Sequence, residues 1–238
     1  MNDMSLYFDY AAATPLSPKS LKVMQPYLSD NFYNPSAIYQ KAINVKKDIY
    51  QARESVAREL GARPSEVVFT AGGTEANNLA IFGVLDQFKG SNVVVTEIEH
   101  DSVLSAAKQL DYKTVRVNKK GIVDLNDLSQ KIDENTVLVS IMLANNEIGA
   151  IQPVNDIASL IKEIRRSRSK TDNNLPIYLH TDACQAVNYL DINASRLGID
   201  LMTINSGKIY GPKQVGALYV KAGLVLRSEE HTSELQSH

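Results

Sequence analysis

One lysine of this sequence lies where it could act as a nucleophile. Lys208 follows the apolar stretch 200–204 and lies within residues 205–213, which are rich in small and polar side chains. This pattern predicts a buried strand that carries the lysine into a turn. A lysine partly shielded from water can lose its proton near neutral pH and form a Schiff base with a carbonyl compound. The alternative is an ordinary surface lysine, because most lysines are exposed.

A turn with two adjacent glycines separates another apolar run from a helical pattern. Residues 70–78 read Thr-Ala-Gly-Gly-Thr-Glu-Ala-Asn-Asn, and apolar residues flank them on both sides. The backbone N–H groups of such a turn, together with the positive end of the helix dipole, attract anions. The glycine spacing differs from that of the nucleotide P-loop and of the dinucleotide fingerprint. A plain turn in which Thr74 caps the helix is the alternative.

Two further polar residues follow apolar runs. Asp182 ends the run that begins at Ile177, and His100 comes shortly after the three valines 93–95. Carboxyl ends of parallel strands border the ligand crevice of open α/β sheets. Asp182 would suit a protonated ring nitrogen there, and His100 could stack on a ring or move protons near pH 7. The alternatives are a helix N-cap for Asp182 and a plain loop position for His100.

Together these residues form a set with a common chemistry. They supply an anion cradle, a stacking imidazole, a carboxylate for a ring nitrogen and an amine for an aldehyde. A site for pyridoxal 5'-phosphate (PLP) requires these groups. The sequence therefore predicts a PLP site.

Several motifs follow one another along most of the chain. They are residues 7–15, Asn34-Pro35-Ser36, Gly72-Gly73-Thr74-Glu75 with Asn77-Asn78, Glu99-His100, the Asn-Asn-Glu-Ile-Gly run 145–149, Asp182 with Gln185, and residues 208–213. In this order they resemble the motifs of the cysteine desulfurases, in the class V aminotransferase group of fold-type I PLP enzymes. Together they are specific where one alone would not be.

The resemblance implies roles for five residues. Lys208 would bind PLP as a Schiff base and move the proton at the substrate α-carbon. His100 would stack on the pyridine ring and assist proton transfer. Asp182 would pair with the ring nitrogen, and Gln185 would donate to the phenolic oxygen of PLP. Asn146 would lie near that oxygen and the substrate carboxylate.

The expected phosphate grip departs from the family pattern. The resemblance implies that Gly73 and Thr74 bind the phosphate of PLP. Many desulfurases also have Ser-Gly-His before the lysine, where this chain has Asn205-Ser206-Gly207. The imidazole is lost and the hydroxyl is moved by one residue, so we expect Ser206 to compensate. Gln214 stands where the family usually has glycine.

The sulfur chemistry of the family depends on residues that this sequence lacks. Full-length desulfurases are much longer than 238 residues, and their sulfur-accepting cysteine and carboxylate-binding arginine lie far downstream of the PLP lysine. The only cysteine of this sequence is Cys184. We interpret it as a small buried side chain and not as the nucleophile. We therefore expect the C-terminal small domain to be missing.

The last twelve residues, 227–238, differ in character from the rest. They coincide with the translation of a widely used DNA sequencing adapter, which suggests a reading frame that ran off a genomic fragment. The alternative is a polar disordered tail. The expected organisation is an N-terminal arm over residues 1–15, a PLP-binding large domain over 16–226 and a non-native tail over 227–238.

Composition excludes several classes of protein. The net charge of −2 argues against a nucleic-acid partner or an anionic membrane surface. No apolar run approaches the roughly 20 residues of a membrane span. The first residues show neither a basic segment nor an apolar signal core. One cysteine fits a reducing compartment, so a cytoplasmic location is expected.

Short apolar strands alternate with helical patterns along the chain. This alternation predicts an α/β fold with a mainly parallel seven-stranded sheet and helices on both faces, as in the large domain of a fold-type I PLP-dependent transferase. The expected strands are 67–70, 93–96, 114–117, 137–143, 177–182, 201–204 and 217–220. The expected helices lie near 41–60, 75–88, 124–132 and 155–168.

Three functions follow from the sequence. The first is a PLP-dependent cysteine desulfurase that uses L-cysteine, forms a homodimer and passes sulfur to an acceptor protein. The second is another class V PLP enzyme, either a selenocysteine lyase or a small-amino-acid aminotransferase. The third is an inactive PLP-binding or dimerising fragment. For the 238-residue chain alone, we expect little or no desulfurase activity. The sulfur could be used in iron–sulfur cluster assembly, in tRNA thiolation or in cofactor synthesis, and the sequence does not distinguish among these uses.

Overall fold

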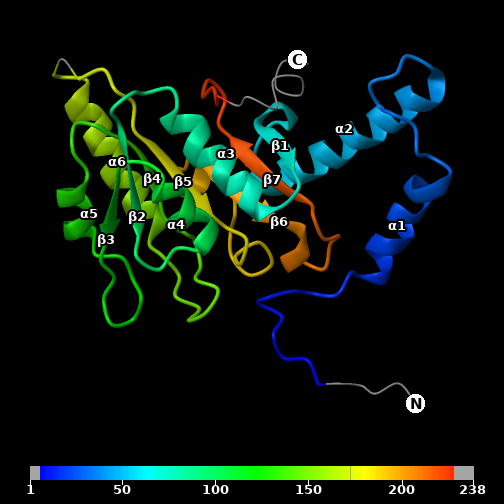
Figure 1. Ribbon diagram of the computed structural model, residues 1–238, viewed down its shortest axis with the longest axis horizontal. Coiled ribbons are helices and arrows are strands. Elements are labelled where there is room, and N and C mark those ends of the chain that lie inside the picture. The colour runs from blue at the N-terminus through cyan, green and yellow to red at the C-terminus, as the bar shows by residue number, and fades with distance from the viewer. Residues whose placement is uncertain (1–5, 172, 228–238) are drawn as a thin grey trace.

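The computed structural model describes residues 6–171 and 173–227, so almost all of the expected tail lies outside the described residues. Its centre is a sheet of seven strands in the order β1-β7-β6-β5-β4-β2-β3 (Figure 1). The strands are β1 Val67–Thr70, β2 Asn92–Thr96, β3 Tyr112–Val115, β4 Thr136–Ser140, β5 Tyr178–Asp182, β6 Leu201–Asn205 and β7 Gly216–Val220.

The sheet is mainly parallel, as predicted. Strands β3, β2, β4, β5 and β6 pair in parallel, and β7 runs antiparallel to both β6 and β1. Since β7 alone is reversed, the carboxyl ends of the other six strands lie along one edge of the sheet. The predicted strand 137–143 ends early as a strand, but Ile141 and Leu143 still donate backbone hydrogen bonds to β5.

Helices cover both faces of the sheet because the strand residues alternate in direction. Val93 and Val95 pack against helices α3 Gly73–Leu85 and α4 Asp101–Ala107. Val94 points to the other face, which is covered by α2 Gln40–Leu60, α5 Leu125–Lys131, α6 Val154–Arg168 and α7 Ala194–Leu197. Both faces are therefore apolar, as a doubly covered parallel sheet requires.

Three helices were not predicted from the sequence. They are α4, the short α7 and α1 Pro18–Ser29. Short 3-10 turns also form at Pro64–Glu66 and Ser206–Lys208. Ser17 is the N-cap of helix α1, and its hydroxyl accepts a hydrogen bond from the Ser20 N–H. Pro18 occupies the first helical position. These are ordinary helix-start signals.

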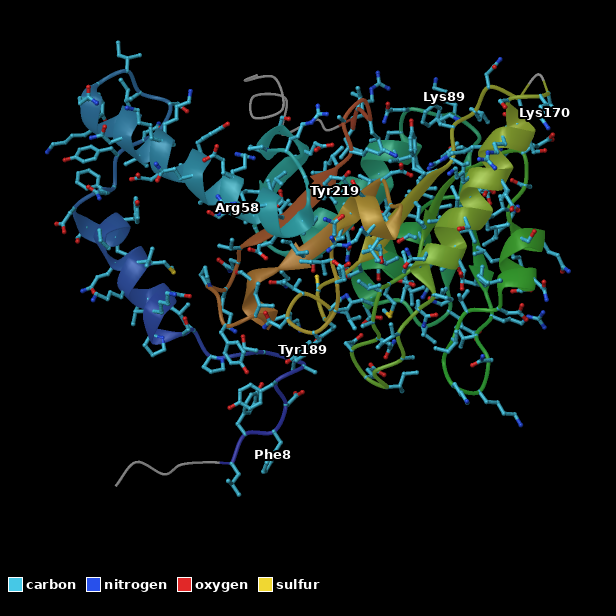
Figure 2. The ribbon with its side chains drawn as sticks, turned by 180° about the vertical axis from the view of Figure 1, so that it is seen from behind. Phe8, Arg58, Lys89, Lys170, Tyr189 and Tyr219 are labelled. Carbon is cyan, nitrogen blue, oxygen red and sulfur yellow. The ribbon has the colours of Figure 1, made fainter. Side chains whose placement is uncertain are left out.

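The N-terminal part of the chain lies apart from the sheet. Helix α1 buries no side chain, and Figure 1 shows it away from the strands, joined to the body through α2. Before it, residues 6–17 form no helix or strand. Figure 2 shows Phe8 on this arm, where it is 86% exposed, below the exposed Tyr189. No helix among the described residues is long and apolar enough to cross a membrane.

Candidate functional site

The carboxyl-end edge of the sheet borders a cavity of about 580 Å³. The turn after β1 and the segments that follow β2, β4, β5 and β6 all contribute to it. The N-terminal arm also lines it, so the structure brings together residues as far apart in the sequence as Asp9 and Lys208. All but one of the predicted site residues line this cavity: Gly73, Thr74, His100, Asn146, Asp182, Gln185 and Lys208.

The N-terminal arm holds the amine of Lys208. Lys208 lies in the 3-10 turn after β6, half-buried, and its Nζ donates to the carbonyl oxygens of Ala11 at 2.9 Å and Ala12 at 2.8 Å. Gln185 Nε2 donates to the same Ala11 carbonyl at 2.8 Å. Thr14 anchors the arm, since its hydroxyl donates to Gly207 and accepts from the Tyr210 N–H. The arm is therefore one wall of the site.

Asp182 is the last residue of β5 and is only 7% exposed. Its Oδ1 accepts from the Cys184 N–H at 2.9 Å, and its Oδ2 accepts from Asn77 Nδ2 at 2.8 Å. No helix follows directly, so Asp182 makes an aspartate turn and is not a helix cap. Each oxygen keeps lone-pair capacity for a donor in the cavity.

His100 caps helix α4 with its ring. Its Nδ1 accepts from the Ser102 N–H at 3.1 Å and lies 2.8 Å from the Ser102 hydroxyl. A backbone N–H can only donate, so Nδ1 carries no proton in this arrangement. The neutral ring therefore holds its proton on Nε2. The loop and the ring-stacking interpretations of His100 are compatible, since the ring also lines the cavity.

The two asparagines of the Asn-Asn-Glu-Ile-Gly run have different roles. Asn145 is buried: its Nδ2 donates to the Ile98 carbonyl at 3.0 Å, and its Oδ1 accepts from the N–H groups of Glu147 and Ile148. It therefore shapes the loop. Asn146 lines the cavity.

Gly73 and Gly216 allow the glycine turn to pack closely against neighbouring segments of the chain. A Cβ atom on Gly73 would lie 2.9 Å from Cys184 Sγ, and one on Gly216 would lie 2.7 Å from the Gly72 carbonyl carbon. Helix α3 begins at Gly73, so its first N–H groups have no partner within the helix. These N–H groups and the Thr74 hydroxyl lie at the cavity wall.

Ser206 is the exception, and its expected place is wrong. Its hydroxyl donates to the backbone carbonyls of Val215 and Pro212, so it does not line the cavity. Asn205 lies there instead. Its Oδ1 accepts from the Gly207 N–H at 3.0 Å, which leaves Nδ2 3.4 Å from the position of a Cβ on Gly73. Asn205 was not predicted as a site residue, because at this position only the loss of the family's serine was considered.

Burial changes the acidity of two groups beside the cavity. It raises the pKa of the Cys184 thiol well above its usual value, and the neighbouring Asp182 raises it further. It also raises the pKa of Glu99 to about 8, despite hydrogen bonds from the Thr96 hydroxyl and the Met142 N–H. Cys184 is therefore a thiol near neutral pH, and Glu99 is protonated.

Residues 6–231 match the family model described as aminotransferase class-V. The chain belongs to this family. It is 40% identical over 225 residues to "Cysteine desulfurase IscS" of Dictyoglomus turgidum, covering 92% of this chain and 54% of the relative. It is 40% identical over 224 residues to "Cysteine desulfurase, mitochondrial" of Drosophila melanogaster, covering 91% of this chain and 46% of the relative.

Solved structures show the same fold. A "NIFS-like protein" superposes with a TM-score of 0.87 at 34% identity, covering 96% of this chain and 62% of that one. "SspA in complex with cysteine" gives a TM-score of 0.83 at 38% identity, covering 91% and 61%. The predicted fold class and the resemblance to cysteine desulfurases are confirmed. The chain spans about half the length of the curated relatives it matches.

Proposed function

We propose that the whole protein is a PLP-dependent cysteine desulfurase. The observation that carries this proposal is the convergence of Lys208, His100 and Asp182 on one cavity beside the glycine turn. The similarity to proteins named cysteine desulfurase supports the choice of substrate. In the reaction the carbon–sulfur bond of L-cysteine breaks and a sulfur–sulfur bond forms with an acceptor thiol. The β-carbon gains a proton, and the products are L-alanine and a persulfide.

The residues present fit PLP. The first N–H groups of α3 and the Thr74 hydroxyl would hold its phosphate, and Asn205 Nδ2 is a further donor beside them. Asp182 and Gln185 line the same cavity, where Asp182 would pair with the ring nitrogen and Gln185 would donate to the phenolic oxygen. When bound, PLP would supply an electron sink for bond cleavage at the substrate.

The protein's own groups would do the proton transfer. The Lys208 amine is held by two carbonyls of the arm, so it must leave them and lose a proton before it can act as a base. His100 presents Nε2–H, which can donate to a substrate atom. Asn146 can donate to the substrate carboxylate.

The sulfur acceptor would not be Cys184. A thiolate is the nucleophilic form of cysteine, and the raised pKa of Cys184 keeps it protonated. It is also the only cysteine of the 238-residue chain. We therefore propose that this chain alone has little or no desulfurase activity unless an external thiol takes the sulfur.

The test uses the purified 238-residue chain and its Lys208→Ala variant. PLP is added, the Schiff base is fixed by borohydride reduction, and the modified peptide is found by mass spectrometry. We expect modification at Lys208 in the unaltered chain and none at this site in the variant. Absence of a PLP adduct at Lys208 would exclude the proposed cofactor site for this chain.

The activity is measured separately, as alanine and sulfide formed from L-cysteine with added dithiothreitol. Alanine and sulfide above the Lys208→Ala background would support a desulfurase. Formation of pyruvate or of an amino-group transfer product would instead favour another class V PLP enzyme.

Homodimer formation is also proposed, supported by the exposed apolar side chains of α1 and the N-terminal arm. We also propose an acceptor protein for the sulfur, and the similarity to proteins named cysteine desulfurase supports this proposal. The cytoplasmic location stays a prediction, because relatives include a protein named mitochondrial.

A further inference from the structure

A buried amide connects two of the site residues. Asn77 lies on α3, is 1% exposed and does not line the cavity. We propose that Asn77 is a positioning residue that links Asp182 to His100 through the Ser102 hydroxyl. This inference rests on the proposed function, since it concerns the groups that would face the ring of PLP.

The distances define a continuous hydrogen-bonded path. Asn77 Nδ2 lies 2.8 Å from Asp182 Oδ2 and 2.8 Å from Ser102 Oγ. Ser102 Oγ lies 2.8 Å from His100 Nδ1. The path joins helices α3 and α4 to the end of β5, so it connects three elements that form separate walls of the site.

Donor and acceptor rules fix the direction of each bond. An ionised carboxylate only accepts, so the amide must turn its nitrogen toward Asp182. The second N–H of that nitrogen then donates to Ser102 Oγ. The Ser102 hydroxyl is thereby left to donate its own proton to His100 Nδ1, which the Ser102 N–H already requires to be an acceptor. One amide thus orients both the carboxylate and the imidazole.

The amide oxygen of Asn77, which is unpaired in the described part of the chain, indicates that an asparagine at this position does not maximise the stability of the fold. Asn77 Oδ1 is buried and has no hydrogen-bond partner among the described residues. An unsatisfied buried polar atom costs free energy, and an apolar residue of similar size would avoid this cost. The donor side of the amide, directed at Asp182 and Ser102, therefore explains the residue better than packing does.

These hydrogen bonds fix the orientations of His100 and Asp182 before any ligand binds. The His100 ring is held with its proton on Nε2, the nitrogen not occupied by Ser102. Asp182 is held by the Asn77 amide and the Cys184 N–H, with lone pairs left for the cavity. Fixed donors and acceptors need no reorganisation during a reaction.

The first test needs no cofactor. Long-range ¹H–¹⁵N correlation spectra of the 238-residue chain report which nitrogen of each histidine ring is protonated and hydrogen-bonded. We expect His100 to be protonated on Nε2. In Asn77→Asp the new carboxylate accepts from Ser102, and in Ser102→Ala the hydroxyl is absent. In both variants His100 Nδ1 loses a donor, so its ¹⁵N resonance should move toward that of a free ring nitrogen.

Controls separate this effect from general damage. Asn126→Ala on α5 and Ser105→Ala on α4 change exposed residues of the same types and should leave the His100 resonances unchanged. His180, whose ring contacts Ser140 and Thr203 instead, is an internal reference in every spectrum. Ser102→Ala keeps the backbone donor and places alanine in a helix, so this variant should fold.

The second test uses PLP. We expect Asn77→Ala to weaken PLP binding about tenfold, because a hydrogen bond to a charged group is lost. The absorption spectrum of bound PLP should also change its pH dependence. Asn77→Asp should weaken PLP binding further than Asn77→Ala does, because it adds a negative charge beside Asp182.

Two results would overturn the inference. One is a His100 Nδ1 resonance that is unchanged in both Asn77→Asp and Ser102→Ala. The other is PLP affinity and spectra that match the unaltered chain in Asn77→Ala. If the unaltered chain binds no PLP, the proposed function fails while the histidine spectra still decide on the path.

Discussion

Glu99 and His100 are neighbours in the chain with opposite surroundings. His100 is exposed at the cavity, whereas Glu99 is 5% exposed beneath it. Glu99 accepts from the Thr96 hydroxyl at 2.6 Å and from the Met142 N–H, so it joins the end of β2 to the segment after β4. Burial without a cationic partner raises the pKa of this carboxyl to about 8.

This raised pKa predicts a pH-dependent stability. The folded state holds the Glu99 proton up to about pH 8, whereas the unfolded state releases it near 4.5. The Glu99 contribution is therefore fully present below pH 4.5 and is lost as the pH rises through 8. His180 acts in the other direction, because burial lowers its pKa to about 4 and stability falls from pH 6.5 downward.

Between pH 6.5 and 8 the Glu99 effect is thus separated from that of His180. We expect the free energy of unfolding to fall with rising pH there, by at most about 1.4 kcal/mol per unit. Glu99→Gln, which keeps an uncharged side chain at every pH, should flatten this slope in urea unfolding. Glu97→Gln, on the same loop but exposed, is the control. Equal slopes in Glu99→Gln and the unaltered chain would contradict the raised pKa.

At the scale of elements, strand β7 and the glycine turn fit together through Gly216. This residue pairs with Thr70 at the end of β1 and with Asn205 at the end of β6. A Cβ atom on it would lie 2.7–2.9 Å from backbone atoms of Gly72. Backbone cannot move aside as a flexible side chain can, so the glycine sets the position of the turn.

Gly216→Ala should therefore disturb both folding and the site. We expect a loss of about 2 kcal/mol in the free energy of unfolding, as for other overpacked positions, and weaker PLP binding. Gly83→Ala on α3 is the graded control, since its nearest contact is Leu226 Cβ at 3.1 Å and alanine favours a helix. A stable Gly216→Ala variant with unaltered PLP affinity would show that the turn does not depend on this contact.

The sequence predicted those elements whose signal is local. The apolar strands were found because they are short, buried and bounded by turns. Helix α4 was missed because His100 caps it with its ring, and histidine is not a usual cap. The sequence did not predict that Asn205, and not Ser206, faces the cavity. The directions of these two side chains depend on their hydrogen-bond partners, which are the Gly207 N–H for Asn205 and the Val215 carbonyl for Ser206.

The Asn77 path lay beyond sequence reasoning for a different reason. Asn77 and Asp182 are 105 positions apart, and only the packing of α3 against the sheet brings them together. The phosphate turn could be predicted because its glycines and helix start are adjacent in the chain. Long-range hydrogen bonds between side chains leave no such local pattern.

At the scale of the whole molecule, the N-terminal region exposes several large apolar side chains. On α1, Leu21 and Leu28 are 50% and 72% exposed, and seven positions apart they share one face of the helix. Phe8 and Tyr189 add exposed aromatic surface near the arm that holds Lys208 (Figure 2). Apolar surface gathered in this way commonly marks an association site.

We expect light scattering to give twice the mass of the 238-residue chain at micromolar concentration. The variant with both Leu21→Asp and Leu28→Asp should raise the dimer dissociation constant at least about tenfold, because each buried leucine contributes ~1.5–3 kcal/mol. Ser29→Asp, which adds one charge on the same helix, should not. A monomer at all concentrations, or a dimer indifferent to the leucine changes, would mean that this face of α1 is not where two copies meet.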